Sequence, residues 1–163
     1  MNIMGLMHWF YDSSLGTGIR ESFWFPGIEC VHVLAITNVF GAIMILDTRL
    51  LGIASKNRPI TELRDDVLPW TWASFVVAVI TGSLLFISRA VDYYPNAAFR
   101  AKIALIAAAG INMTIFEFTT GRTVQRWDTA SDTPMAAKIA GGLSIILWIG
   151  VILCGRYVGW TAS

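Results

Sequence analysis

The stretch PWTWASFVVAVITGSLLFIS occupies residues 69–88, and no charged side chain lies between Asp66 and Arg89. An α-helix rises about 1.5 Å per residue, so about 20 apolar residues cross the hydrocarbon core of a bilayer. Such a helix also satisfies its own backbone hydrogen-bonding groups, which lipid cannot do. We therefore predict that this stretch is a membrane-spanning helix.

Three further apolar stretches have a similar length. They cover residues 23–46, 98–118 and 139–160. The connections 47–68, 89–97 and 119–138 hold most of the charged residues, several prolines and the Asn and Asp turn residues. This alternation is typical of helical membrane proteins. The sequence predicts an all-α integral membrane protein, with a four-helix transmembrane bundle over residues 23–163.

Residues 1–22 form a separate N-terminal segment. Met1–Tyr11 is aromatic and nearly uncharged, but it is too short to span a bilayer. We expect a short interfacial helix there, whose lipid side carries the following side chains: Met4, Met7, Trp9 and Phe10. Ser13–Gly18 is interpreted as a small polar linker.

The composition supports a membrane class and limits the partners. Hydrophobic residues make up 55% of the chain and charged residues 14%, against about 25% charged in ordinary soluble proteins. Seven tryptophans suit the interface between lipid and water. The net charge of +1 offers no basic patch, so we exclude nucleic acid as a partner. The expected partners are the lipid bilayer, bound lipids, and either further copies of this chain or the subunits of a larger membrane complex.

Ionisable side chains inside the spans are the first candidates for function, because they are costly in lipid. Glu29 and His32 lie three residues apart and share one helix face, which continues to Asp47. We expect that face to look into the bundle. Arg156 lies at the level of Glu29, and a Glu29–Arg156 ion pair is predicted because it relieves two desolvation penalties.

A second group of polar residues is expected near the opposite membrane surface. It contains Asp47, Arg49 and Glu117, with Asn112 deeper in the third span. We expect Arg49 to anchor the helix end by extending toward the headgroups. The two levels together are interpreted as a structural polar cluster with these members: Glu29, His32, Asp47, Arg49, Asn112, Glu117 and Arg156.

The Glu29–His32 pair allows three readings besides a structural one. His32 could be the axial ligand of haem b, with Met113, His8 or a partner subunit's histidine as the second ligand. Glu29 and His32 also form one Glu-x-x-His half-motif of a di-iron site, although the second half-motif is missing. A proton or ion path through His32, Asn38 and Asn112 is the third.

One run of motifs resembles a known family. The residues that carry it are Glu29-Cys-Val-His32, Gly41, Asp47-Thr-Arg49-Leu-Leu-Gly52, Thr81-Gly82, Phe86, Lys102, Asn112, Ser144 to Trp148, and Gly155-Arg156. The chain resembles an uncharacterised family of small four-span bacterial inner-membrane proteins, distantly similar to copper-resistance D-type membrane domains. The resemblance implies a multi-pass topology in a bacterial inner membrane. A histidine often stands near the position of Glu117 in that family, so its absence here weakens a two-histidine cofactor.

No nucleophile–base pair and no phosphate loop is present, so we expect a non-enzymatic protein. The leading prediction is an accessory or structural subunit of a larger membrane assembly, or a homo-oligomer. A haem-binding electron-transfer subunit and a small channel or transporter are the alternatives. With four spans, the side that holds the first and third connections carries seven Lys and Arg residues and the side of the termini carries five. This distribution predicts periplasmic termini.

Overall fold

The computed structural model describes residues 2–129 and 133–161, and within them the regular secondary structure is entirely helical. The helices in chain order are α1 (Ile3–Tyr11), α2 (Ser14–Arg20), α3 (Trp24–Leu50), α4 (Ile60–Ser88), α5 (Ala90–Tyr93), α6 (Ala97–Phe118), the 3-10 helix η1 (Thr120–Arg126) and α7 (Met135–Thr161). Helices α3, α4, α6 and α7 are long and apolar enough to cross a membrane. The predicted fold class, a four-span helical membrane protein with a short N-terminal helix, is confirmed.

Two of the predicted span limits need correction. Helix α4 begins at Ile60, well before residue 69, so Pro69 lies inside the helix. Helix α3 continues to Leu50, so Asp47 and Arg49 belong to the helix and not to a connection. The physical reason is that hydropathy detects only the part of a helix that contacts lipid. Backbone hydrogen bonding continues past that part into the polar layer.

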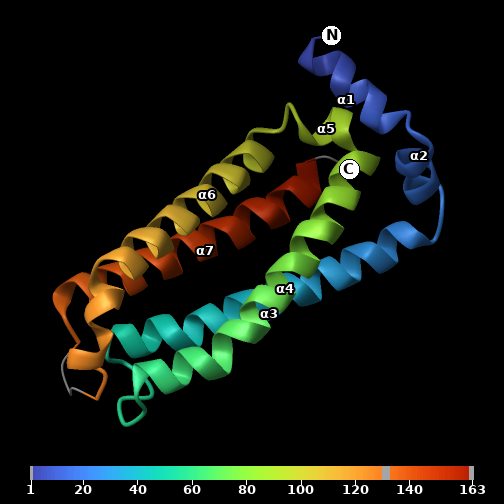
Figure 1. Cartoon of the computed structure of the whole chain (residues 1–163). Coiled ribbons are helices and arrows are strands. Elements are labelled where there is room, and N and C mark those ends of the chain that lie inside the picture. The colour runs from blue at the N-terminus through green and yellow to red at the C-terminus, as the bar shows by residue number, and fades with distance from the viewer. Residues whose placement is uncertain (1, 130–132, 162–163) are drawn as a thin grey trace.

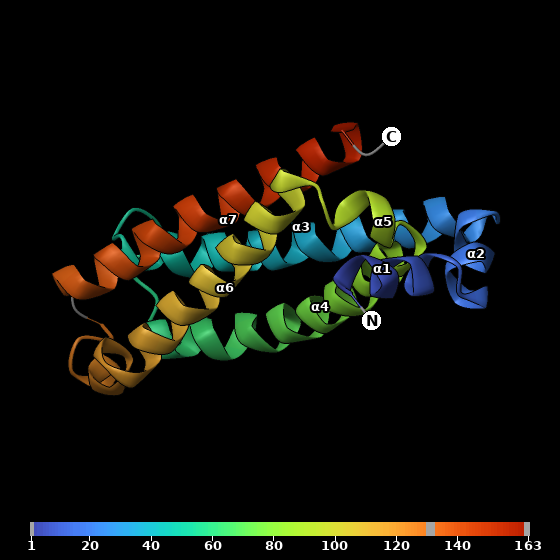
Figure 2. The same ribbon diagram turned by 90° about the horizontal axis from the view of Figure 1, so that it is seen from above.

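The four long helices form two hairpins (Figures 1 and 2). Helix α3 packs along α4, helix α6 packs along α7, and the contact between α3 and α7 joins the two pairs. Helices α4 and α6, both fully described, have few close backbone contacts, and they are joined by the Arg64–Glu117 ion pair and by the stacked rings of Phe86 and Phe99. Figure 1 shows that α3 and α7 approach at the end where α3 finishes and separate toward the end with the two termini. The backbones of α4 and α6 are therefore widely spaced, and side chains make the contacts between them.

The N-terminal segment folds as two helices that dock on the end of the bundle nearest the termini (Figure 1). Residues 14–20 are helix α2 and not a linker, because the Ser13 hydroxyl caps the helix by accepting from the Gly16 amide. The Arg20 guanidinium donates to the carbonyl oxygens of Tyr11 at 3.1 Å and Ser88 at 3.0 Å. Met7, predicted to face lipid, is buried at 6% exposure, since its helix packs against protein on that side.

Replacing Gly16 with alanine should detach this N-terminal unit. A Cβ at Gly16 would lie 2.7 Å from the Phe10 carbonyl oxygen and 3.2 Å from that of Ile87, and backbone atoms cannot move aside easily. We expect a loss of about 1 to 3 kcal/mol, measured as the free energy of unfolding by SDS titration in mixed micelles. Gly18→Ala is the matched control, because its Cβ would meet nothing within 4 Å. Equal stability of the two variants would contradict this packing.

Candidate intramembrane binding site

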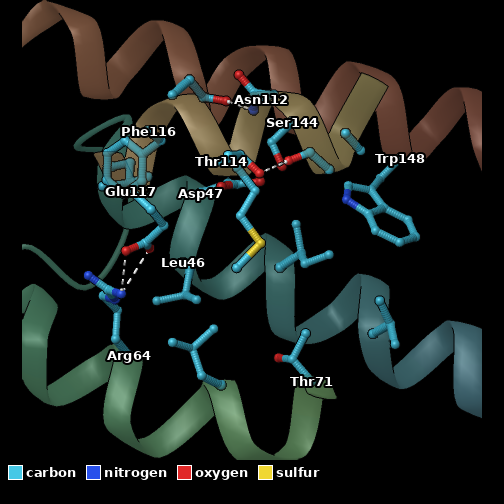
Figure 3. Close-up of a pocket in the computed structure, with 18 of the residues that line it drawn as sticks. Leu46, Asp47, Arg64, Thr71, Asn112, Thr114, Phe116, Glu117, Ser144 and Trp148 are labelled. Atoms are coloured by element: carbon cyan, nitrogen blue, oxygen red, sulfur yellow. Dashed lines mark hydrogen bonds and ion pairs between the residues drawn. The ribbon is translucent and has the colours of Figure 1, made fainter. Parts of the chain in front are cut away.

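A cavity of about 390 Å³ lies among the four long helices, at the end of the bundle where α3 finishes (Figure 3). Most of its wall is apolar, with aromatic side chains from α4, α6 and α7. The aromatic residues are Trp72, Phe75, Phe116 and Trp148. The polar side chains come from all four helices: Asp47, Arg64, Thr71, Asn112, Thr114, Glu117 and Ser144. A concave, mainly apolar space with a few polar groups is the usual form of a small-molecule site.

The cavity has one polar end and one apolar end. Asp47 lies about one helical turn from the end of α3 at Leu50, and Arg64 and Glu117 line the same end of the cavity. Val39 precedes Asp47 by about two turns, so it lies about 12 Å deeper in the bundle. Phe75 also lines the cavity and lies deeper in the bundle than Arg64 on the same helix, α4. Ile106 likewise lies deeper than Glu117 on α6. The long axis of the cavity therefore runs from the membrane boundary toward its interior.

Asp47 is the most unusual group in this wall. Its residue is only 7% exposed, and its Oδ2 atom has no hydrogen-bond partner. No other buried side-chain oxygen or nitrogen in the described part of the chain is left in this state. Ser144 on α7 lines the cavity beside this carboxylate. A buried carboxylate oxygen without a donor is costly, so it marks a place where a further donor is favoured.

Arg64 and Glu117 close the polar end of the cavity. The Arg64 guanidinium lies 2.8 Å and 2.9 Å from the two carboxylate oxygens of Glu117 (Figure 3). Their side chains are 24% and 34% exposed, so the pair reaches the surface of the bundle. Because this pair is neutral as a whole, an ionised Asp47 leaves the cavity with a net negative charge.

The side chain of His32 on α3 contacts α4. Its Nδ1 lies 2.9 Å from the Thr81 hydroxyl oxygen on α4, and that hydroxyl donates to the Val77 carbonyl oxygen at 2.7 Å. The hydroxyl proton is therefore engaged, so His32 is the donor in this contact. A Cβ at Gly82 would lie 2.9 Å from the His32 ring, which shows how closely α4 approaches it.

The prediction that one face of the first span looks into the bundle is wrong near the start of the span. Asp47 is buried, but Glu29 is exposed on the surface of α3. The predicted Glu29–Arg156 ion pair is also wrong: no ion pair joins these two residues, and Arg156 is exposed. The reason is that α3 and α7 separate toward the end with the two termini (Figure 1), and Glu29 near the start of α3 and Arg156 near the end of α7 both belong to that end.

The described residues of one chain do not form a complete set of haem or metal ligands. Met113 lines the cavity, whereas His32 does not, since it lies about 10 Å before Val39 along α3. The structure therefore does not bring these two haem-ligand candidates together. Within the described residues, no three His, Cys, Asp or Glu side chains are close enough to hold a metal ion, which includes the surroundings of Glu29.

Arg49 does not join Asp47 and Glu117, nor does it extend to the headgroups. It is 2% exposed and donates to the carbonyl oxygens of Arg58 at 3.1 Å and Asp128 at 3.2 Å, and to the Thr133 hydroxyl at 3.5 Å. The side chain thus ties the α3–α4 connection to the segment before α7. The predicted seven-residue polar cluster is consequently several separate contacts.

Asp128, which the sequence did not single out, helps to hold the same two segments together. Its carboxylate accepts from the Thr61 amide at 2.9 Å and the Thr61 hydroxyl at 2.5 Å, which caps the first turn of α4. Burial alone would raise the pKa of Asp128, but hydrogen bonds from Thr61 and Ile60 and the Arg49 charge hold that pKa below its ordinary value. No spacing in the sequence links Asp128 to a helix start so distant in the chain.

These features define a class: a four-span helical membrane protein with a cavity lined by all four spans. The chain belongs to the family of unknown function DUF6644, which matches residues 14–161. Neither a curated protein nor a solved structure matches the chain. The predicted membership of an uncharacterised family is confirmed, while the similarity to copper-resistance D-type domains and the bacterial origin stay predictions.

Proposed function

We propose that this protein is a non-enzymatic membrane protein that binds a small, mainly apolar molecule in the cavity beside Asp47. One observation carries the proposal: Asp47, whose buried Oδ2 has no hydrogen-bond partner, lines an apolar cavity of about 390 Å³. Cavities of this size and lining accommodate small organic molecules. A ligand that supplies a donor to Asp47 would offset the cost of burying that oxygen.

The lipid phase is the proposed source of the ligand. Between the Arg64–Glu117 pair and the stacked Phe86 and Phe99 rings, helices α4 and α6 have few close backbone contacts, and both contribute to the cavity wall. A molecule dissolved in the bilayer can therefore enter sideways between them without crossing either membrane surface. The aromatic side chains of Trp72 and Trp148 then offer a large contact area to its apolar part.

The cellular setting that we propose is a bacterial inner membrane with periplasmic termini, in a larger assembly or a homo-oligomer. The orientation is supported by the excess of Lys and Arg around the α3–α4 and α6–α7 connections, which include Arg49, Arg58 and Arg126. In this orientation the polar end of the cavity lies toward the cytoplasmic surface. Ligand binding then makes the chain a sensing or carrier subunit of such an assembly.

The test uses quenching of tryptophan fluorescence by brominated amphiphiles, because Trp72 and Trp148 line the cavity. We expect saturable quenching by 10-bromodecylammonium or 10-bromodecanol in the purified protein. Gly110→Phe should abolish the saturable part, since Gly110 lines the cavity and its Cβ would meet no atom within 4 Å.

Gly159→Phe is the matched control. Gly159 also has open space around its Cβ position, but it is not part of the cavity wall. Its variant should keep the saturable quenching unchanged. Quenching that rises without saturation, or that is the same in both phenylalanine variants, would show that the probes only dissolve around the protein and would contradict the proposal.

A further inference from the structure

We infer that the cavity selects amphiphiles whose polar group is a cationic hydrogen-bond donor, such as a primary ammonium, held at Asp47 with the apolar tail pointing into the membrane. This inference rests on the proposed function and names the ligand class of the same site. It follows from three properties of the described wall: its engaged donors, its charge and its shape.

Three polar side chains of the wall donate hydrogen bonds within the protein. The Thr71 hydroxyl donates to Val67 at 2.9 Å and the Thr114 hydroxyl donates to Gly110 at 2.8 Å, each along its own helix. The Asn112 amide donates to the Ala140 carbonyl oxygen at 3.0 Å. An incoming molecule therefore meets an acceptor, the Asp47 Oδ2, and needs to bring the donor itself.

The charge of the wall favours a cation over a neutral or an anionic group. The positive charge of Arg64 is compensated by Glu117 at 2.8 Å, so it is not available to attract an anion. The Asp47 carboxylate has no compensating cation among the ion pairs of the described residues. A buried charge is stabilised by an opposite charge that also hydrogen-bonds to it. An ammonium group meets both requirements, whereas a carboxylate head would be repelled.

The shape of the cavity fits an amphiphile in one orientation. Asp47 lies at the boundary end, close to the Arg64–Glu117 pair, and the aromatic and aliphatic wall extends from there toward the membrane interior (Figure 3). A lipid-phase amphiphile already carries its polar group at the membrane boundary and its tail inside. It can therefore move sideways between α4 and α6 while its head stays at one depth.

The experiment compares three brominated probes with the same ten-carbon chain: 10-bromodecylammonium, 10-bromodecanol and 10-bromodecanoate. Dissociation constants are measured at neutral pH by saturable tryptophan quenching. We expect the ammonium to bind about tenfold or more tightly than the alcohol, because a hydrogen bond between charged groups exceeds a neutral one by roughly that factor. The carboxylate should bind most weakly.

Asp47→Asn removes the charge and keeps the side-chain shape. It should lower ammonium affinity to the level of the alcohol and leave alcohol affinity unchanged. Asp65→Asn is the matched control, because Asp65 is exposed and lies outside the cavity wall. It should change none of the three affinities. Far-UV circular dichroism verifies that both variants are folded, and we expect the Asp47 variant to be at least as stable as the parent protein.

The outcomes separate this inference from the proposed function. Equal affinity for ammonium and alcohol in the parent protein would overturn the cationic selectivity and leave cavity binding intact. Persistence of the ammonium preference in Asp47→Asn, or its equal loss in Asp65→Asn, would also overturn it. If no probe quenches saturably, the proposed function itself is wrong.

Discussion

Replacing Arg49 with lysine should lower the free energy of unfolding by about 3 kcal/mol, as measured by SDS titration in mixed micelles. Arg49 is 2% exposed, and its guanidinium reaches three acceptors in two separate parts of the chain, on Arg58, Asp128 and Thr133. A lysine ammonium is compact and lies at the end of a flexible stem, so it cannot reach these acceptors together. The substitution would keep a buried charge while removing most of its compensation.

Arg126→Lys is the matched control for this experiment. Arg126 ends η1 and is exposed, so the same chemical change should alter stability by no more than about 0.5 kcal/mol. The Arg49 variant should also expose the two connections to protease before the spans unfold. A loss in Arg49→Lys that equals the loss in the control would show that the Arg49 contacts do not hold the two connections together.

Replacing Gly141 with valine should destabilise the bundle by about 2 to 3 kcal/mol, because overpacking forces the helices apart. A Cβ at Gly141 would lie 3.1 Å from both the Asp47 carbonyl oxygen and the Leu50 Cβ. This is the contact between α7 and α3 that joins the two hairpins. We expect the same variant to weaken probe binding in the cavity, since Asp47 would move with its backbone.

Gly142→Val tests whether the effect belongs to the helix contact. A Cβ at Gly142 would lie 3.7 Å from the Leu51 side chain, which is an ordinary van der Waals distance. Both variants place a β-branched residue at the same level of α7. The change in helix propensity is therefore the same in both and cancels when their stabilities are compared. If the Gly142 variant loses as much stability as the Gly141 variant, the close approach of α3 and α7 is not what stabilises the bundle.

The four spans were predictable because lipid imposes a simple requirement on each of them separately. Residues 69–88 contain no charge and are long enough to cross, and α4 includes all of them. The starts and ends of the helices were not predictable by the same rule. Asp128, distant in the sequence, caps the start of α4, and Arg49 lies inside a helix that continues beyond its apolar part.

The candidate site was only partly visible in the sequence. Asp47, Asn112, Met113 and Glu117 were singled out as polar or ligand-type residues in or near the spans, and the structure places all four in one cavity wall. Their grouping was predicted in part, since the sequence places Asp47 and Glu117 at one membrane level with Asn112 deeper, but Arg49 was expected with them and Met113 was not. Arg64, the partner of Glu117, and Ser144, the neighbour of Asp47 on α7, were missed because no helical spacing relates residues of different spans.

The sequence by itself determined that this protein is a four-span helical membrane protein, because the cost of a charge or an unpaired backbone group in lipid adds up residue by residue along the chain. Only the tertiary structure decided which ionisable residues face one another. That choice depends on where two helices cross: Gly141 lets α7 approach α3 beside Asp47, while the same helices separate near Glu29. The close contact buries Asp47, and the wide spacing of the α4 and α6 backbones leaves a cavity next to it.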